Sequence, residues 1–152
     1  MADPASAIMG PVYCDASALA KVYLREPDSK DIDSLLAGRR DVIISELTIT
    51  EVISSIARRR REGAIPATTA AQIRGTILAD LEAGSFLRSD LTPETHREAE
   101  KLLLAASVAL RTLDALHVAG AVLARAASVA AYDRRLREGA ASVGLFLYPQ
   151  SL

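Results

Sequence analysis

The sequence predicts an α/β domain in which a mostly parallel sheet of about five strands is flanked by helices, forming a three-layer sandwich. Short apolar runs alternate with segments of helical periodicity along the 152-residue chain. Two of these runs, residues 12–15 and 129–133, end on aspartates, Asp15 and Asp133, and helix-like sequence follows each at once. Open α/β sheets bind ligands beyond the carboxyl ends of their strands. The two aspartates therefore indicate a shared metal pocket.

The composition favours one domain with an aliphatic core. A chain of 152 residues can bury one proper core but not two, and 50% of it is hydrophobic, with 4% aromatic residues and no Trp. The formal charge of −1 offers no general attraction for nucleic acid, so a polyanion must meet a local basic patch. The single cysteine, Cys14, excludes an internal disulfide and is expected to be a buried thiol in a reducing compartment.

The chain shows no targeting signal. No apolar stretch approaches the ~20 residues needed to span a bilayer, and the start Met1-Ala2-Asp3-Pro4 lacks the features of a signal peptide. We therefore expect a cytoplasmic protein with no membrane partner. Residues 1–152 are interpreted as a single domain, with 1–10 as a flexible N-terminal extension.

The first half of the chain is predicted to form two strands, each followed by helix. The strand 12–15 leads into a helix to about residue 24, for which Ser17 is a plausible N-cap, and Pro27 stops it. A short helix to residue 37 follows Asp28 and ends at Gly38. The β-branched run 41–45 is the second strand. Its last residue, Ser45, can cap a helix that ends near Gly63 and buries a stripe at helical spacing, comprising Ile49, Val52, Ile53 and Ile56.

The second half continues the alternation. Pro66 opens a helix that Gly84 breaks, residues 85–91 form the third strand, and another helix starts at Pro93. Thr112 is the expected cap of an almost wholly apolar helix over 113–125. The remaining elements are a strand at 128–132, a short helix at 134–138 ended by Gly139, and a last strand at 143–148.

Four carboxylates fall just after a strand or near a helix start: Asp15, Glu51, Asp114 and Asp133. Each alone has an ordinary explanation as a cap or first-turn residue, and Glu51 lies opposite the apolar stripe, as a solvated residue would. Together they share one rim of the expected sheet. Crowded carboxylates repel unless a cation neutralises them, and oxygen ligands suit Mg²⁺ or Mn²⁺. The lack of a Cys/His cluster argues against structural zinc.

Four blocks of the sequence carry a family resemblance: residues 13–21, 45–52, 113–119 and 132–136. In order and spacing they resemble the signature blocks of PIN-domain proteins, most closely the VapC-type toxins of toxin–antitoxin pairs. The resemblance implies a metal-dependent endoribonuclease, the toxin of a type II system, with Asp15, Glu51, Asp114 and Asp133 holding one or two Mg²⁺ or Mn²⁺ ions. It also implies a VapB-like antitoxin, an RNA substrate and a homodimer.

The resemblance extends to two neighbouring positions. Ser17 matches a hydroxyl that helps to order the pocket in the family, and an N-cap role accounts for it equally well. Where many relatives have Thr or Ser two residues before the final aspartate, this chain has Ala131, so one hydroxyl that would support Asp133 is missing.

Arginines and a histidine adjoin the acidic blocks. Arg58 and Arg59 follow Glu51 along one helix and Arg134 follows Asp133, so these are candidates for contacts with RNA phosphates, although a solvated helix end explains most such arginines. His117, three residues after Asp114, could approach the pocket, but packing on the apolar helix is favoured.

Two other functions compete with the nuclease. A catalytically silent PIN module could bind RNA or a protein partner, although the intact acids count against it. A metal-dependent phosphotransfer enzyme of another α/β fold could use Asp15, but it would need a second acid at position 17 and a supporting lysine motif, and neither is present.

Overall fold

The computed structural model describes residues 8–152 and contains one five-stranded, entirely parallel sheet in the order β3-β2-β1-β4-β5. The predicted α/β class and five-stranded sheet are confirmed. The strands are β1 (Val12–Cys14), β2 (Val42–Ser45), β3 (Leu87–Ser89), β4 (Ser128–Ala130) and β5 (Phe146–Tyr148). The helices are α1 (Ala16–Tyr23), α2 (Ser29–Leu36), α3 (Glu46–Arg61), α4 (Ala67–Glu82), α5 (Pro93–Ala105), α6 (Thr112–Leu123) and α7 (Arg134–Ser142).

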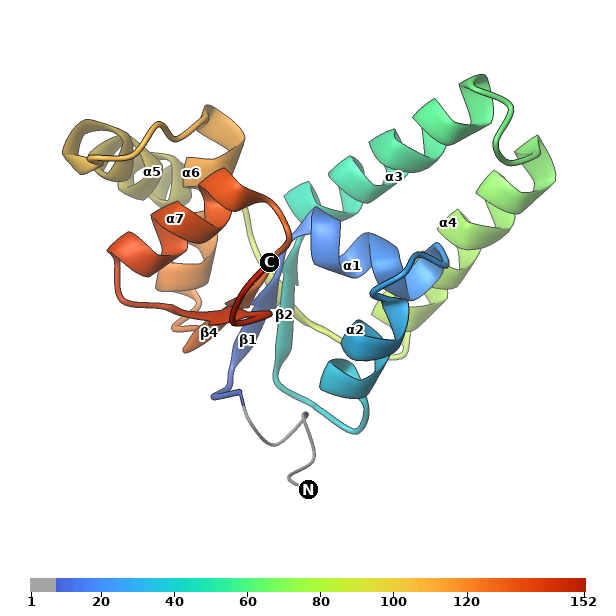
Figure 1. Ribbon diagram of the computed structural model, residues 1–152, viewed down its shortest axis with the longest axis horizontal. Helices are drawn as coiled ribbons and strands as arrows, with labels where there is room; N and C mark the ends of the chain where they lie inside the picture. The colour runs from blue at the N-terminus through green and yellow to red at the C-terminus, as the bar shows by residue number, and fades with distance from the viewer. Residues whose placement is uncertain (1–7) are drawn as a thin grey trace.

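The helices form two layers on the sheet (Figure 1). Helices α1 to α4 pack on one face against Val12, Cys14 and Ile44, while α6 and α7 pack on the other against Tyr13 and Ile43. Successive residues of a strand point to opposite faces, so neighbours on β1 enter different cores. Both faces of the central strands are covered, which explains why β1 and β2 are almost continuously apolar rather than alternating.

The strand order shows where a ligand-binding crevice is expected at the edge of this sheet. The chain moves outward from β1 through β2 to β3, then returns to start β4 on the other side of β1. The point between β1 and β4 is the topological switch, where connections leave in opposite directions and a crevice opens. Asp15 directly follows β1 and Asp133 lies just beyond β4. The two strand-end aspartates thus flank the switch point on neighbouring strands.

Two expected helix caps differ in the structure. Asp15, not Ser17, is the N-cap of α1, and its Oδ1 accepts a hydrogen bond from the backbone N–H of Ala18 at 2.9 Å. Arg111, not Thr112, precedes the first turn of α6, and Asp114 Oδ2 accepts from its backbone N–H at 3.0 Å. In both cases a pocket carboxylate satisfies a helix N-terminus, which a hydroxyl cap was expected to do.

The end of α7 also differs from the expected one. Gly139 lies inside the helix, which continues to Ser142 and ends before Gly144, whose φ is +84°. A Cβ at Gly139 would stand 2.6 Å from Leu110 Cδ2. The glycine therefore permits close packing of α7 on the segment before α6, and Gly144 supplies the left-handed backbone that ends the helix.

The expected N-terminal extension falls mostly outside the described residues, which begin at Ile8. Ile8 is partly buried against the core of the α1–α4 layer. Within residues 8–152, no helix combines the length and apolar character needed to cross a bilayer.

Candidate active site

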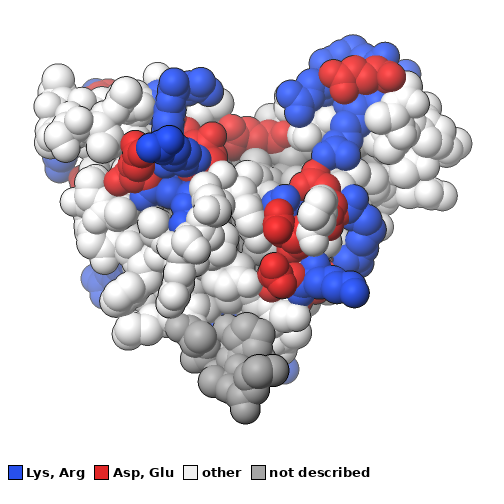
Figure 2. Space-filling view, in the orientation of Figure 1, with Lys and Arg blue, Asp and Glu red and all other residues white. Residues whose placement is uncertain are grey.

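The four acids line one pocket at the carboxyl edge of the sheet. Asp15, Glu51, Asp114 and Asp133 reach this cavity of about 530 Å³ from β1, α3, α6 and the turn before α7. Figure 2 shows the molecule hollowed between the α5–α7 layer and the α3–α4 pair, with acidic side chains at the base of the hollow and basic side chains on both sides. A larger hollow of about 660 Å³ beside β5 is mostly apolar and holds none of the four acids.

Asp15 is the most buried of the four, with 4% of its surface exposed. Both carboxylate oxygens accept from Ser17 Oγ, at 2.7 and 2.8 Å. Burial raises the pKa of the Asp15 carboxyl from 3.8 to about 6, and the hydrogen bonds from Ser17 and from the Ala18 N–H oppose this rise. Its ionised form therefore gains more from a nearby cation than an exposed carboxylate would.

Ser17 connects the two aspartate segments. Besides donating to Asp15, its Oγ accepts from the backbone N–H of Tyr132 at 2.8 Å. Arg137 donates from Nη1 to the carbonyl of Ala131 at 2.8 Å and from Nη2 to that of Pro149 at 2.6 Å. The backbone before Asp133 is thus held from both sides although Ala131 carries no hydroxyl.

Replacing Ser17 by Ala should destabilise the protein by about 1–3 kcal/mol, because it leaves the Tyr132 N–H without a partner and the buried Asp15 carboxylate with only the Ala18 N–H. Urea unfolding of the metal-free protein measures the effect. Ser34→Ala, on the exposed side of α2, is the control and should change stability by less than about 0.5 kcal/mol. A Ser17→Ala variant as stable as the control would contradict the bridging role.

Asp114 and Asp133 each use one oxygen in the fold and leave the other open. Asp114 Oδ2 accepts from the Arg111 N–H, and Asp133 Oδ1 accepts from the Leu136 N–H at 3.0 Å. Within residues 8–152, the second oxygen of each has no protein partner, and neither acid forms an ion pair. Asp114 is 9% exposed, whereas Asp133 lies on the surface. Each can offer an oxygen to a ligand without giving up its capping bond.

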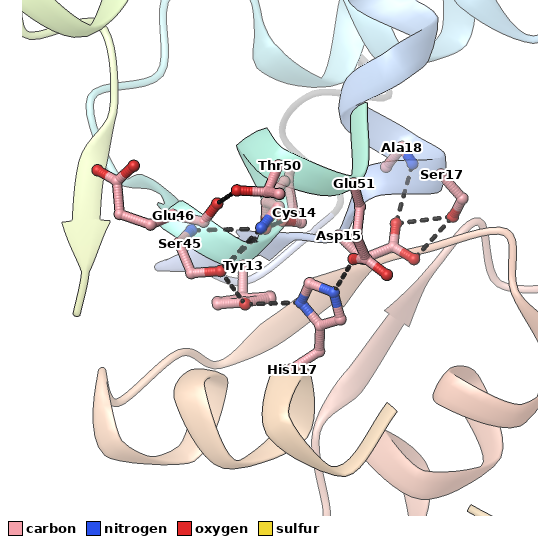
Figure 3. A network of polar contacts seen from close by, with 11 residues as sticks. Tyr13, Cys14, Asp15, Ser17, Ala18, Ser45, Glu46, Thr50, Glu51 and His117 are labelled. Carbon is pink, nitrogen blue, oxygen red and sulfur yellow. Dashed lines mark hydrogen bonds and ion pairs between the residues drawn. The ribbon is translucent and has the colours of Figure 1, made fainter. Parts of the chain in front are cut away.

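Glu51 contacts His117 inside the pocket. Its Oε2 contacts His117 Nε2, and the other imidazole nitrogen, Nδ1, lies 2.8 Å from the hydroxyl of Tyr13 (Figure 3). Tyr13 also donates to Ser45 Oγ at 3.1 Å, and burial raises the pKa of its phenol to about 12, so that it stays protonated. His117 is buried, which agrees with the favoured prediction that it packs on the apolar helix. It also lines the pocket, which that prediction did not include.

The basic residues of the pocket wall divide into paired and unpaired ones. Lys21 Nζ lies 2.8 Å from Glu26 and 4.5 Å from the centre of the Tyr132 ring, and Arg59 pairs with the same Glu26. Arg58 and Arg111 also line the pocket, and neither forms an ion pair within the described part of the chain. Arg134 pairs with Glu138 on the surface and does not line the pocket.

Cys14, next to Asp15, is not part of this chemistry. The thiol is fully buried, and burial raises its pKa far above the usual range, so it stays protonated. The expected buried structural cysteine is confirmed.

The donor set fits a hard divalent cation. Three of the four acids form no ion pair within residues 8–152, and Asp114 and Asp133 each have an open oxygen. In the same residues, no three His, Cys, Asp or Glu side chains lie close enough together to hold a metal ion as they stand. The pocket therefore supplies suitable oxygens on separate walls, and side-chain movement must bring them together around one ion.

A family model of the PIN domain matches residues 12–141. The chain belongs to the PIN-domain family. The matched range spans β1 to α7 and contains Asp15, Glu51, Asp114 and Asp133, so the resemblance carried by the four sequence blocks is confirmed. Among the curated proteins compared by sequence, none matches the chain.

Solved structures share the PIN fold of this chain. VapC20 of Mycobacterium tuberculosis, described as a sarcin-ricin loop cleaving toxin, aligns with TM-score 0.67 and 15% identity over 88% of this chain and 95% of its own. PAE2754 of Pyrobaculum aerophilum aligns with TM-score 0.65 and 20% identity, over 90% and 82% of the two chains. FitAcB of Neisseria gonorrhoeae aligns with TM-score 0.59 and 15% identity, over 91% of this chain and 97% of its own.

Sequence reasoning missed several residues of this PIN-domain pocket. Arg111 and Glu26 line it but lie in none of the four sequence blocks, and Lys21 ends the first block but had no predicted role. For His117 a signal was present, because its spacing of three residues from Asp114 puts both on one side of α6. Arg137 had no signal, since its partners are backbone carbonyls that only the fold brings near it.

Proposed function

We propose that this PIN domain is a metal-dependent endoribonuclease that acts as the toxin of a type II toxin–antitoxin system. One observation carries the proposal: four carboxylates from separate elements line one open pocket, and Asp15, Asp114 and Asp133 have no cationic side chain paired with them in the described residues. Such a cluster is costly without a positive ligand. The likeness to VapC20, a toxin described as cleaving the sarcin-ricin loop, supports RNA as the substrate.

Asp15, Glu51, Asp114 and Asp133 would hold one or two Mg²⁺ or Mn²⁺ ions. Bound there, such an ion would lower the pKa of a water molecule, position the scissile phosphate and stabilise charge on the leaving oxygen. The Asp114 and Asp133 side chains would use their open oxygens and keep their capping bonds. Ser17 would fix the direction of Asp15, and His117 that of Glu51.

RNA phosphates would meet the arginines that border the acids. Arg58 on α3 and Arg111 before α6 approach the pocket from different elements and have no ion-pair partner in residues 8–152. We propose that these two contact the phosphates nearest the scissile bond. Arg59 would join them if a phosphate displaced Glu26, and Arg134 is placed to meet RNA further out.

Changing Arg58 or Arg111 to Gln should weaken binding of single-stranded RNA and lower the salt slope of its affinity by about 0.7 for each phosphate that the variant no longer neutralises. Fluorescence anisotropy over a series of salt concentrations measures the slope, in an Asp15→Asn background that prevents cleavage. Arg40→Gln, before the amino end of β2, is the matched control and should leave the slope unchanged. Equal slopes for all three variants would show that neither pocket arginine contacts phosphate.

The catalytically silent alternative makes a different prediction for metal uptake. Calorimetric titration of the metal-free protein with Mn²⁺ should give binding by the wild type, and Asp114→Asn should weaken it strongly. No uptake at millimolar Mn²⁺ would favour a silent module that binds RNA or a protein. Binding of Mn²⁺ followed by cleavage of added RNA would support the nuclease.

The proposal includes a VapB-like antitoxin that blocks the pocket, a homodimeric toxin and a cytoplasmic location. A short reading frame for a DNA-binding antitoxin directly upstream of this gene would support it. If co-expression of that product neither protects cells nor yields a complex with this chain, the toxin assignment fails even where the nuclease activity stands.

A further inference from the structure

Glu51 lines the pocket and has one polar side-chain partner in the described residues. It lies in the second turn of α3, on the side opposite Ile49, Val52 and Ile56, where a glutamate normally extends into solvent. Within residues 8–152 its carboxylate forms a hydrogen bond or ion pair with one side chain, the imidazole of His117 through Nε2. The direction of Glu51 therefore depends on where this imidazole is held.

The imidazole is held by Tyr13. His117 and Tyr13 are 3% and 1% exposed, their rings meet edge to face with centroids 5.8 Å apart, and the phenol oxygen lies 2.8 Å from Nδ1. Tyr13 belongs to β1, the central strand of the sheet, and every residue of this strand is buried. A ring fixed by a buried strand and a polar bond has little rotational freedom.

The same phenol also binds the start of α3. Its hydroxyl donates to Ser45 Oγ, and Ser45 is the N-cap of the helix that carries Glu51. The contacts therefore close a ring through β1, α6 and α3 (Figure 3). Helices α3 and α6 belong to opposite layers of the sandwich and carry Glu51 and Asp114, so this ring fixes two walls of the pocket relative to each other.

We propose that Tyr13 and His117 are positioning residues: this buried pair holds Glu51 in the pocket and thereby sets the affinity of the site for a divalent cation. The inference rests on the proposed function and assigns a role to two residues that do not themselves bind the ion. Outer-shell partners of this kind typically contribute 10- to 100-fold in metal affinity or activity.

Two substitutions at position 117 separate positioning from packing. Gln is long enough to place its amide nitrogen near the position of Nε2, within reach of Glu51, whereas Asn ends near the position of Nδ1. Both remove the imidazole, so a role confined to ring packing would affect them alike. Tyr13→Phe keeps the buried ring and removes only the hydroxyl, so it tests the pair should a variant at position 117 not fold.

The test is calorimetric titration of the metal-free variants with Mn²⁺, after thermal unfolding in EDTA has established that each is folded. His117→Asn should weaken Mn²⁺ binding by roughly 10- to 100-fold. His117→Gln should stay within a few-fold of wild type, and Tyr13→Phe should fall between the two. His96→Asn, which changes the other histidine of the chain on the exposed side of α5, is the control and should bind Mn²⁺ as the wild type does.

Three results would overturn the inference. The first is a His117→Asn variant that binds Mn²⁺ as tightly as wild type, and the second is a Tyr13→Phe variant that does so. The third is an equal loss of Mn²⁺ affinity in His117→Gln and His117→Asn. Wild-type protein that takes up no Mn²⁺ would remove the proposed function as well. Normal uptake by wild type together with normal uptake by His117→Asn would remove the inference alone.

Discussion

Replacing Asp114 by Asn should lower the rate of RNA cleavage in Mg²⁺ by more than about 100-fold, above the range typical of residues that only support a metal ligand. The change removes the charge of a 9% exposed carboxylate whose Oδ1 has no protein partner in the described residues. The amide oxygen can still accept from the Arg111 N–H, so the start of α6 should remain intact. The single-turnover cleavage rate of a labelled single-stranded RNA is the measurement.

The matched control for this substitution is Asp90→Asn, an exposed aspartate in the loop between β3 and α5 that does not line the pocket. It should cleave as fast as wild type. Asp133→Asn should also reduce the rate, by less, because Asp133 lies at the exposed rim. An Asp114→Asn variant that folds and keeps more than about a tenth of the wild-type rate would contradict its role as a metal ligand.

Replacing Asp15 by Asn should stabilise the metal-free protein at pH 7. Burial raises the pKa of Asp15 from 3.8 to about 6, so between these pH values the folded state binds a proton that the unfolded state has released. The stability from this group is therefore fully present below about pH 4 and is lost as pH rises through 6. A shift of about two pKa units corresponds to at most roughly 3 kcal/mol, and Asn removes that penalty.

Thermal unfolding in EDTA at pH 5, 6 and 7 measures this effect. As the pH rises from 5 to 7, the wild type should lose stability because Asp15 ionises in the folded state, and the Asn variant should lose less. At pH 7 the Asn variant should unfold at a higher temperature than the wild type. Added Mn²⁺ should stabilise the wild type by mass action and leave the variant almost unchanged. An Asn variant less stable than wild type at pH 7 in EDTA would contradict the assigned burial cost.

Local chemistry made much of the fold predictable. Strand ends, helix periodicity and caps depend on neighbouring residues, so β1, β2 and the stripe of Ile49, Val52 and Ile56 follow directly from the sequence. The wrong end of α7 has a non-local cause. From local sequence, Gly139 is predicted to end a helix. In the structure it lies inside α7 and lets this helix pack closely on Leu110. Leu110 is 29 positions away, so no local pattern contains this contact.

The acids of the pocket were predictable, and the contacts that orient them were not. Strand ends and family spacing located Asp15, Glu51, Asp114 and Asp133. His117 and Tyr13 are 104 residues apart, and His117 and Glu51 are 66 apart, so their contacts depend on how the two helix layers meet across the sheet. Ser17 shows both cases: its closeness to Asp15 is local, but its bond to the Tyr132 N–H joins segments 115 residues apart.

The most direct test of the central claim is cleavage of single-stranded RNA by the purified wild-type protein in Mn²⁺ or Mg²⁺ and in EDTA, with analysis of the product ends. Attack by a metal-activated water leaves a linear phosphate, whereas attack by the RNA 2′-hydroxyl leaves a 2′,3′-cyclic phosphate. We expect cleavage only with metal and only linear phosphate ends, and we expect Asp114→Asn to cleave more than about 100-fold more slowly. Cleavage that persists in EDTA, or cyclic ends, would contradict the account.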